Sequence, residues 1–85
     1  MSKREKLLRR LASRPKDFTW AELVSLMMSL EFEMESGSGS GSGRKFVNPA
    51  TEGTLFIHEP YPAKLLKSYQ MRDAIHFLKK EGLLS

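Results

Sequence analysis

The apolar residues at the start of the chain recur at the spacing of an amphipathic helix, which we predict over residues 2–14. Ser2 is a suitable N-cap, and Pro15 discourages continuation of the helix. The other side of this helix is strongly basic, which is typical of an ordinary solvated face and is also compatible with a polyanionic partner. The apolar stripe consists of Leu7, Leu8, Leu11 and Ala12, and the cations are Lys3, Arg4, Lys6, Arg9 and Arg10.

A second helix is predicted over residues 19–30. Thr19 is expected to be its N-cap, with Glu22 at the spacing of a capping box and Phe18 placed to pack onto Leu23. Its apolar positions cover more than one side, which indicates burial between the first helix and a sheet. A methionine-rich face can also bind a partner, but in a small protein it is more often core. The apolar residues are Trp20, Leu23, Val24, Leu26, Met27, Met28 and Leu30.

After residue 30 the hydrophobic period changes from helical to two, which predicts strands over 32–35, 44–47 and 54–58. Phe32 and Met34 are expected to face the core, while the glutamates that alternate with them face solvent. The second strand is stopped by an Asn-Pro turn, and a short turn joins it to the third. The pattern therefore predicts a three-stranded antiparallel sheet.

The third strand has one apolar side and one mixed side. Leu55 and Ile57 alternate with Thr54, Phe56 and His58, so Phe56 and His58 are expected together on the outer side. An exposed aromatic ring beside an imidazole is suited to contacting RNA bases.

Pro60 and Pro62 exclude regular structure after the third strand, and a final helix is predicted over residues 69–81. Ser68 is expected to be the N-cap of this helix, and Gly82 is expected to close it. His76 falls among outward positions of the helix and is interpreted as a surface residue.

Composition limits the remaining possibilities. The 85 residues, 40% of them hydrophobic, can form one small core, so we expect a single domain over 1–85. The net charge of +4 and the sequence pI of about 9.6 suit a polyanionic partner. With no cysteine and two histidines, neither disulfides nor a zinc site is expected, and no metal or cofactor is predicted. No apolar run reaches the length of a membrane span and the start lacks a signal-peptide core, so a soluble cytoplasmic protein without a membrane partner is expected.

The stretch Ser36–Gly43 alternates glycine and serine and is followed at once by Arg44 and Lys45. Such residues can bring backbone N–H groups and cations close to a large anion, which we expect to be RNA. The alternative is that this stretch is a flexible linker, natural or engineered, between two parts of the chain.

Several local strings, in their order and spacing, resemble the HicA toxins of bacterial toxin–antitoxin modules. The resemblance covers nearly the whole chain and implies a small mRNA interferase with an α+β fold like that of double-stranded-RNA-binding domains. That fold is a three-stranded antiparallel sheet packed against helices, here with an extra N-terminal helix as in a longer subgroup. The strings are Lys16-Asp17-Phe18-Thr19-Trp20 before Glu22-Leu23, Gly-Ser-x-x-x-Phe at Gly41, Ser42 and Phe46, Asn48-Pro49, Pro62-Ala63-Lys64, Leu66-Lys67 and Glu81-Gly82-Leu83.

The chain departs from the family at Gly43, where the family commonly has the histidine that acts on RNA. His58 is the remaining imidazole in a suitable place, because imidazole can take or give a proton near neutral pH. Tyr61 could donate a proton or stack on a base. The expected RNA-binding set is Gly41, Ser42, Gly43, Arg44, Lys45, Lys64 and Lys67.

Two classes of function follow. The first is a toxin that cleaves mRNA as a metal-independent endoribonuclease and is held inactive by a cognate HicB-like antitoxin, without contacting DNA itself. The second is a non-catalytic RNA-binding or antitoxin-binding module of the same fold, which the missing histidine at Gly43 permits.

Overall fold

A computed structural model describes residues 2–36 and 43–84 of the chain. This part of the protein has an α+β fold with three helices and a three-stranded antiparallel sheet, as the sequence predicts at this level. Each element lies within two residues of its expected bounds. The elements are α1 (Lys3–Ala12), α2 (Trp20–Ser29), β1 (Glu33–Ser36), β2 (Gly43–Val47), β3 (Thr54–His58) and α3 (Ser68–Lys80).

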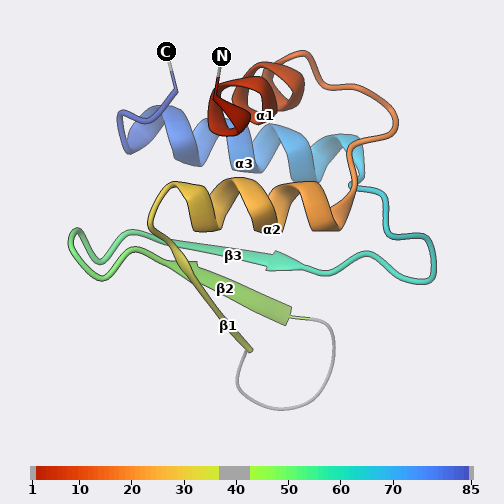
Figure 1. The fold of residues 1–85 in the computed structure, drawn as a ribbon. Helices are drawn as coiled ribbons and strands as arrows, with labels where there is room; N and C mark the ends of the chain where they lie inside the picture. The colour runs from red at the N-terminus through yellow and green to blue at the C-terminus, as the bar shows by residue number, and fades with distance from the viewer. Residues whose placement is uncertain (1, 37–42, 85) are drawn as a thin grey trace.

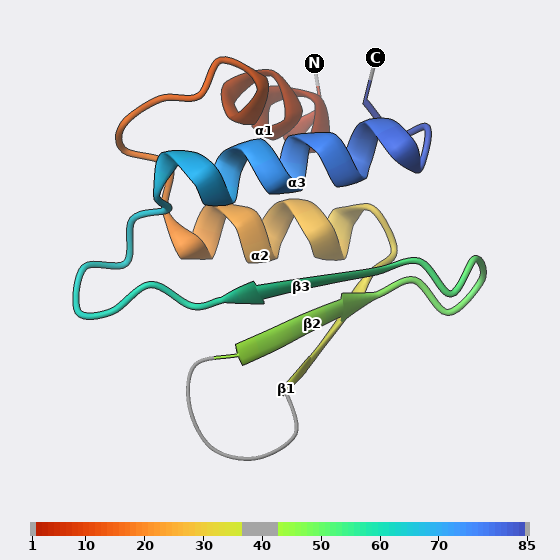
Figure 2. The same ribbon diagram turned by 180° about the vertical axis from the view of Figure 1, so that it is seen from behind.

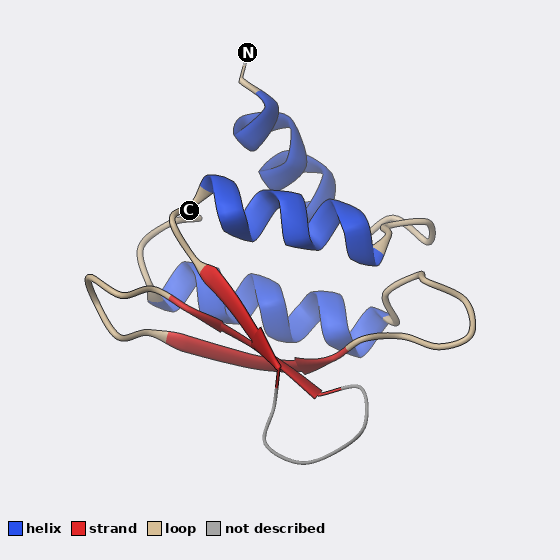
Figure 3. Ribbon diagram, turned by 60° about the horizontal axis from the view of Figure 1, so that its bottom comes forward, coloured by secondary structure: helices blue, strands red, loops and turns tan. Residues whose placement is uncertain are grey.

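The sheet has the order β1-β2-β3, and helices cover one of its faces (Figure 1). α2 and α3 lie over this face, and α1 packs on them from the far side (Figures 1 and 2). The other face of the sheet is not covered by any described element (Figure 3). α1 and α3, the first and last elements of the described chain, both lie on the helical side, away from this open face (Figure 1). Within residues 2–36 and 43–84, no helix is long and apolar enough to cross a bilayer.

α2 is closed at both ends by local hydrogen bonds. The expected capping box is present, since the Thr19 hydroxyl accepts from the Glu22 N–H at 3.1 Å and the Glu22 carboxylate accepts from the Thr19 N–H at 3.0 Å. At the other end Glu31 has a φ of 72°, a left-handed conformation that usually belongs to glycine. The Phe32 N–H then bonds the Met27 carbonyl at 3.0 Å, so the chain leaves α2 directly into β1.

The start of α3 differs from the prediction. Its N-cap is Lys67 and not Ser68, which is already the first helical residue. The side-chain oxygen of Gln70 accepts from the Lys67 N–H at 3.0 Å, and this bond sets the helix start one residue earlier. At the other end, Gly82 adopts a φ of 77° and closes the helix as expected.

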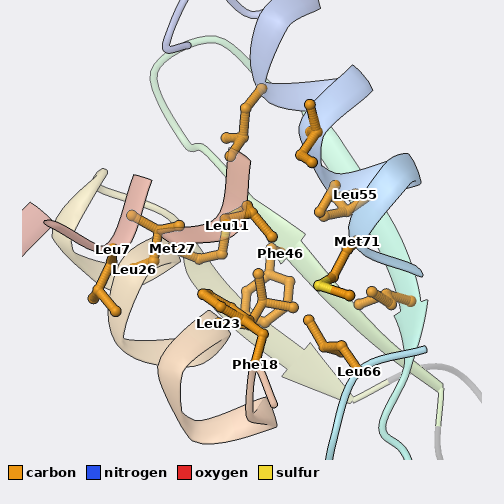
Figure 4. Packing of buried hydrophobic residues seen from close by; sticks show 14 of the residues in the cluster. Leu7, Leu11, Phe18, Leu23, Leu26, Met27, Phe46, Leu55, Leu66 and Met71 are labelled. Carbon is orange, nitrogen blue, oxygen red and sulfur yellow. The ribbon is translucent and has the colours of Figure 1, made fainter. Parts of the chain in front are cut away.

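One hydrophobic core lies between the sheet and the helices (Figure 4). Phe18, Leu23 and Phe46 are completely buried there, and the Trp20 and Phe46 rings are 5.8 Å apart. Phe32 is buried as expected, but Met34 is 39% exposed and only borders the core. Met34 lies opposite Phe46 on the edge strand β1, where packing is available from one side only.

Arg10 fastens α1 to the start of α2. Its guanidinium bonds the Glu22 carboxylate, with an Nε to Oε2 distance of 2.7 Å, and the Asp17 carboxylate at 3.0 Å. The hydrogen bond from Arg10 holds the pKa of Glu22 below its usual value, and the same contact raises the pKa of Arg10. One basic residue of α1 therefore has a structural role and is not part of a free cationic face.

Candidate nucleic-acid interface

The strand register sets which side chains share the open face of the sheet. Lys45 lies between Glu35 of β1 and Phe56 of β3, and Gly43 lies directly opposite His58. Because neighbours along a strand point to opposite faces, these residues alternate with the buried Phe46, Leu55 and Ile57. We call this set of exposed and half-buried residues the open face, and its members are Glu33, Glu35, Gly43, Lys45, Val47, Thr54, Phe56 and His58.

Phe56 and His58 lie together on the open face, as the alternation in β3 predicts. Their ring centroids are 5.4 Å apart and the ring planes are nearly perpendicular, at 89°. Phe56 is 54% exposed, and His58 is also exposed. A large apolar ring held at a solvent-facing position does not contribute to the core, so this pair is the main candidate for contact with a ligand.

Gly43 provides the space that the Phe56 ring occupies. A Cβ atom at position 43 would lie 2.8 Å from Cζ of Phe56, closer than real side chains approach. The ring of Phe56 therefore extends diagonally across the sheet from its register partner Lys45 to the backbone of Gly43. A side chain at position 43 would require this ring to move.

Gln70 supports His58 from the helical side of the sheet. Its side-chain amide donates to the His58 carbonyl at 2.8 Å, while its oxygen accepts from the Lys67 N–H. Gln70 is only 4% exposed and is the one buried polar residue in the described part of the chain. Sequence reasoning missed it, although a glutamine beside Met71 on the inward side of the last helix was a visible signal.

A second group of charged residues lies where β3 leads into α3. The Glu59 carboxylate pairs with Arg44, at 3.4 Å from Nη2, and with the ammonium group of Lys64. The Lys64 ammonium also lies 5.8 Å from the centre of the Tyr61 ring, and Tyr61 itself is 84% exposed. Glu59 was not among the expected site residues, and it links two of the expected cations.

Backbone hydrogen bonds hold the segment that carries Lys64. The Trp20 N–H donates to the Lys64 carbonyl at 2.9 Å, and the Leu66 N–H donates to the Phe18 carbonyl at 2.8 Å. These bonds join the irregular chain before α3 to the start of α2. The backbone position of Lys64 is therefore fixed by the fold and does not depend on its side-chain contacts.

The expected RNA-binding residues do not form one continuous row. Lys45 is on the open face, 3.9 Å from Glu35, whereas Arg44 belongs to the other face of β2 and pairs with Glu59. Lys67 is exposed at the start of α3. Gly41 and Ser42 are outside the described residues. The structure thus brings Gly43, Lys45, Phe56 and His58 together and puts Arg44, Lys64 and Tyr61 in a separate cluster.

No three of the described His, Asp or Glu side chains gather as metal ligands would. Comparison of the chain with protein-family models, with curated proteins and with solved structures gives no match. The chemistry of the open face therefore has to be judged from its own groups. It presents an imidazole for proton transfer, an aromatic ring for stacking and an ammonium group for phosphate.

Proposed function

We propose that this protein is a HicA-like toxin that cleaves mRNA in the cytoplasm as a metal-independent endoribonuclease, and that its fold is of the double-stranded-RNA-binding-domain type. The observation that carries the proposal is the exposed pair of Phe56 and His58 on a sheet face that no described helix covers. The net charge of +4 favours encounter with RNA. A cognate HicB-like antitoxin would inhibit the protein by covering this face.

His58 lies close to Gly43, the position where the HicA family commonly has a histidine. Gly43 and His58 are direct register partners, and the Cβ positions of such partners are about 5 Å apart in an antiparallel sheet. An imidazole on β3 can therefore reach the same part of the open face as one on β2. In this proposal His58 supplies the imidazole that position 43 lacks.

The reaction requires two proton transfers and one displacement. His58 removes the proton from a ribose 2′-OH, the 2′-oxygen attacks the adjacent phosphorus, and the bond from phosphorus to the 5′-oxygen breaks. The products are a 2′,3′-cyclic phosphate and a 5′-OH, whose oxygen takes its proton from the protonated imidazole. Lys45 stabilises the negative charge that develops on the phosphate oxygens.

Cleavage of an end-labelled transcript by the purified protein, in buffer containing EDTA, tests this mechanism. His58→Ala should lower the cleavage rate by about 100-fold or more, the usual contribution of a general acid or base. His76→Ala is the matched control, because His76 is exposed on α3, away from the open face, and its loss should leave the rate unchanged. A transcript with 2′-deoxyribose at the cleaved position should resist the wild-type protein. Equal rates for wild type and His58→Ala would refute the role of His58.

The same variants can be compared in cells. Expression without the antitoxin should arrest growth for wild type and His76→Ala, and His58→Ala should relieve the arrest. Co-expression of the antitoxin should relieve it for all toxic variants.

A non-catalytic RNA-binding or antitoxin-binding module is the second candidate. It is favoured by Glu59, which neutralises part of the charge that Arg44 and Lys64 would offer to a phosphate. RNA binding with transcripts that stay intact over long incubation would select this candidate over the enzyme.

A further inference from the structure

We infer that Phe56 is a stacking platform for one unpaired RNA base and that the ligand of the open face is single-stranded RNA, not duplex RNA. The inference rests on the proposed function, since it takes the open face to be the RNA surface. It goes beyond that function by naming the form of RNA and the residue that selects it.

The exposure and position of Phe56 are the first support. Phe56 is 54% exposed, the tip of its ring lies next to Gly43, and the centre of its ring is 5.4 Å from that of His58. Aromatic rings presented in this way on a sheet bind bases by stacking, and a base must leave its helix to be stacked. Phe56 is the only phenylalanine, tyrosine or tryptophan of the open face as defined above, so the face offers a place for one base.

The distribution of charge across the sheet is the second support. Glu33 and Glu35 occupy the β1 side of the open face, whereas Lys45 and His58 lie toward β2 and β3. Three strands span only about 10 Å, so a duplex on this face would place phosphates against both glutamates. A single strand that follows β2 and β3 stays clear of Glu33, and its phosphate can bind Lys45 in place of the Glu35 carboxylate, which lies 3.9 Å from the Lys45 ammonium group, while a base meets Phe56.

Binding of a short 2′-fluoro RNA, which lacks the attacking hydroxyl, tests the inference without cleavage. The probe is used single-stranded and annealed to its complement, and affinities are measured by fluorescence anisotropy. Wild type should prefer the single strand, and Phe56→Leu should weaken that binding by about 5- to 150-fold, the range for loss of one stacked base. Tyr69→Leu is the matched control, because Tyr69 is 49% exposed on α3, which lies on the covered side of the sheet.

Gly43→Ala is a second variant that keeps the aromatic ring but displaces it. It should weaken single-strand binding in the same direction as Phe56→Leu. The double variant should lose no more than Phe56→Leu alone, because Gly43 acts through the ring. A full additional loss in the double variant would overturn the role given to Gly43.

Phe56→Trp provides a direct readout of stacking. The single native tryptophan, Trp20, is only 7% exposed, so quenching of the emission on addition of the single strand would come from position 56. Equal binding of both RNA forms, unchanged by Phe56→Leu, would overturn the inference while the proposed RNA surface stands. Failure of the wild-type protein to bind either form of RNA would contradict both the inference and the proposed RNA surface.

Discussion

The two faces of the sheet are built from the same strands but are under different physical constraints. In β3, Leu55 and Ile57 are buried against the helices, while Phe56 and His58, which alternate with them, are exposed. The two covered-face residues of β3 are accounted for by packing. Packing does not explain Phe56 on the open face, because a buried phenylalanine ring would stabilise the fold more than an exposed one does. The difference separates residues kept for stability from residues available for a ligand.

Alanine substitutions of two phenylalanines give the largest contrast. Phe46→Ala should lower the free energy of unfolding by about 3–5 kcal/mol, because its ring is completely buried against Trp20. A loss of that size approaches the whole stability of a small domain. Phe56→Ala should cost less than about 1 kcal/mol, since its ring is exposed. Chemical denaturation followed by circular dichroism measures both values, and equal losses would erase the distinction between the faces.

Gln70 connects the two faces and should affect both properties. Gln70→Leu removes the two side-chain hydrogen bonds that Gln70 makes to the Lys67 N–H and the His58 carbonyl, which should lower the free energy of unfolding by about 1–3 kcal/mol. Because the His58 backbone loses a support, transcript cleavage should also slow at temperatures where the variant is fully folded. Arg72→Leu, at an exposed position of α3, is the control for both measurements. A destabilised variant with wild-type cleavage would limit Gln70 to folding.

Acid should lower the free energy of unfolding by protonating Glu22, which bonds Arg10 on the helical side of the molecule. Since the folded state lowers the pKa of Glu22, its contribution is present above the usual glutamate pKa of about 4.3 and is lost as the pH falls through the lower folded value. Thermal unfolding of wild type and Glu22→Gln should therefore differ at neutral pH and converge in strong acid. Glu33→Gln, on the open face, should show a much smaller difference at neutral pH. A gap between wild type and Glu22→Gln that persists in strong acid would contradict the linkage.

The smallest expected effect is a gain in stability. Glu31→Gly should raise the free energy of unfolding by about 0.5–1 kcal/mol, because glycine adopts a φ of 72° without the steric cost that glutamate bears. Glu33→Gly, two residues later within β1, should destabilise. Differential scanning calorimetry distinguishes the two. RNA cleavage by Glu31→Gly should equal that of wild type, and a fall would link this turn to the open face.

The helices and strands could be predicted because their signals are local. The capping box at Thr19, the prolines and the change of period after residue 30 each act within a few residues. The start of α3 was misplaced because Ser68 has the better capping side chain, whereas the structure uses the Gln70 oxygen to bond the Lys67 N–H.

The candidate site was predictable where it lies within one strand and not where it depends on distant contacts. Alternation along β3 was enough to place Phe56 beside His58. The pairing of Glu59 with Arg44 and Lys64 joins residues from different parts of the chain, and no local spacing in the sequence predicts it. The same alternation separates Arg44 from Lys45, so two adjacent cations cannot be counted as one phosphate clamp.

The first and last elements of the described chain, α1 and α3, lie on the helical side, and this has a practical consequence. An affinity tag, a fluorophore or a surface linker attached before α1 or after α3 would be joined on the side of the molecule opposite Phe56 and His58. Immobilised protein would present these residues to the surrounding solution, which suits a test of the proposed RNA binding on a solid support.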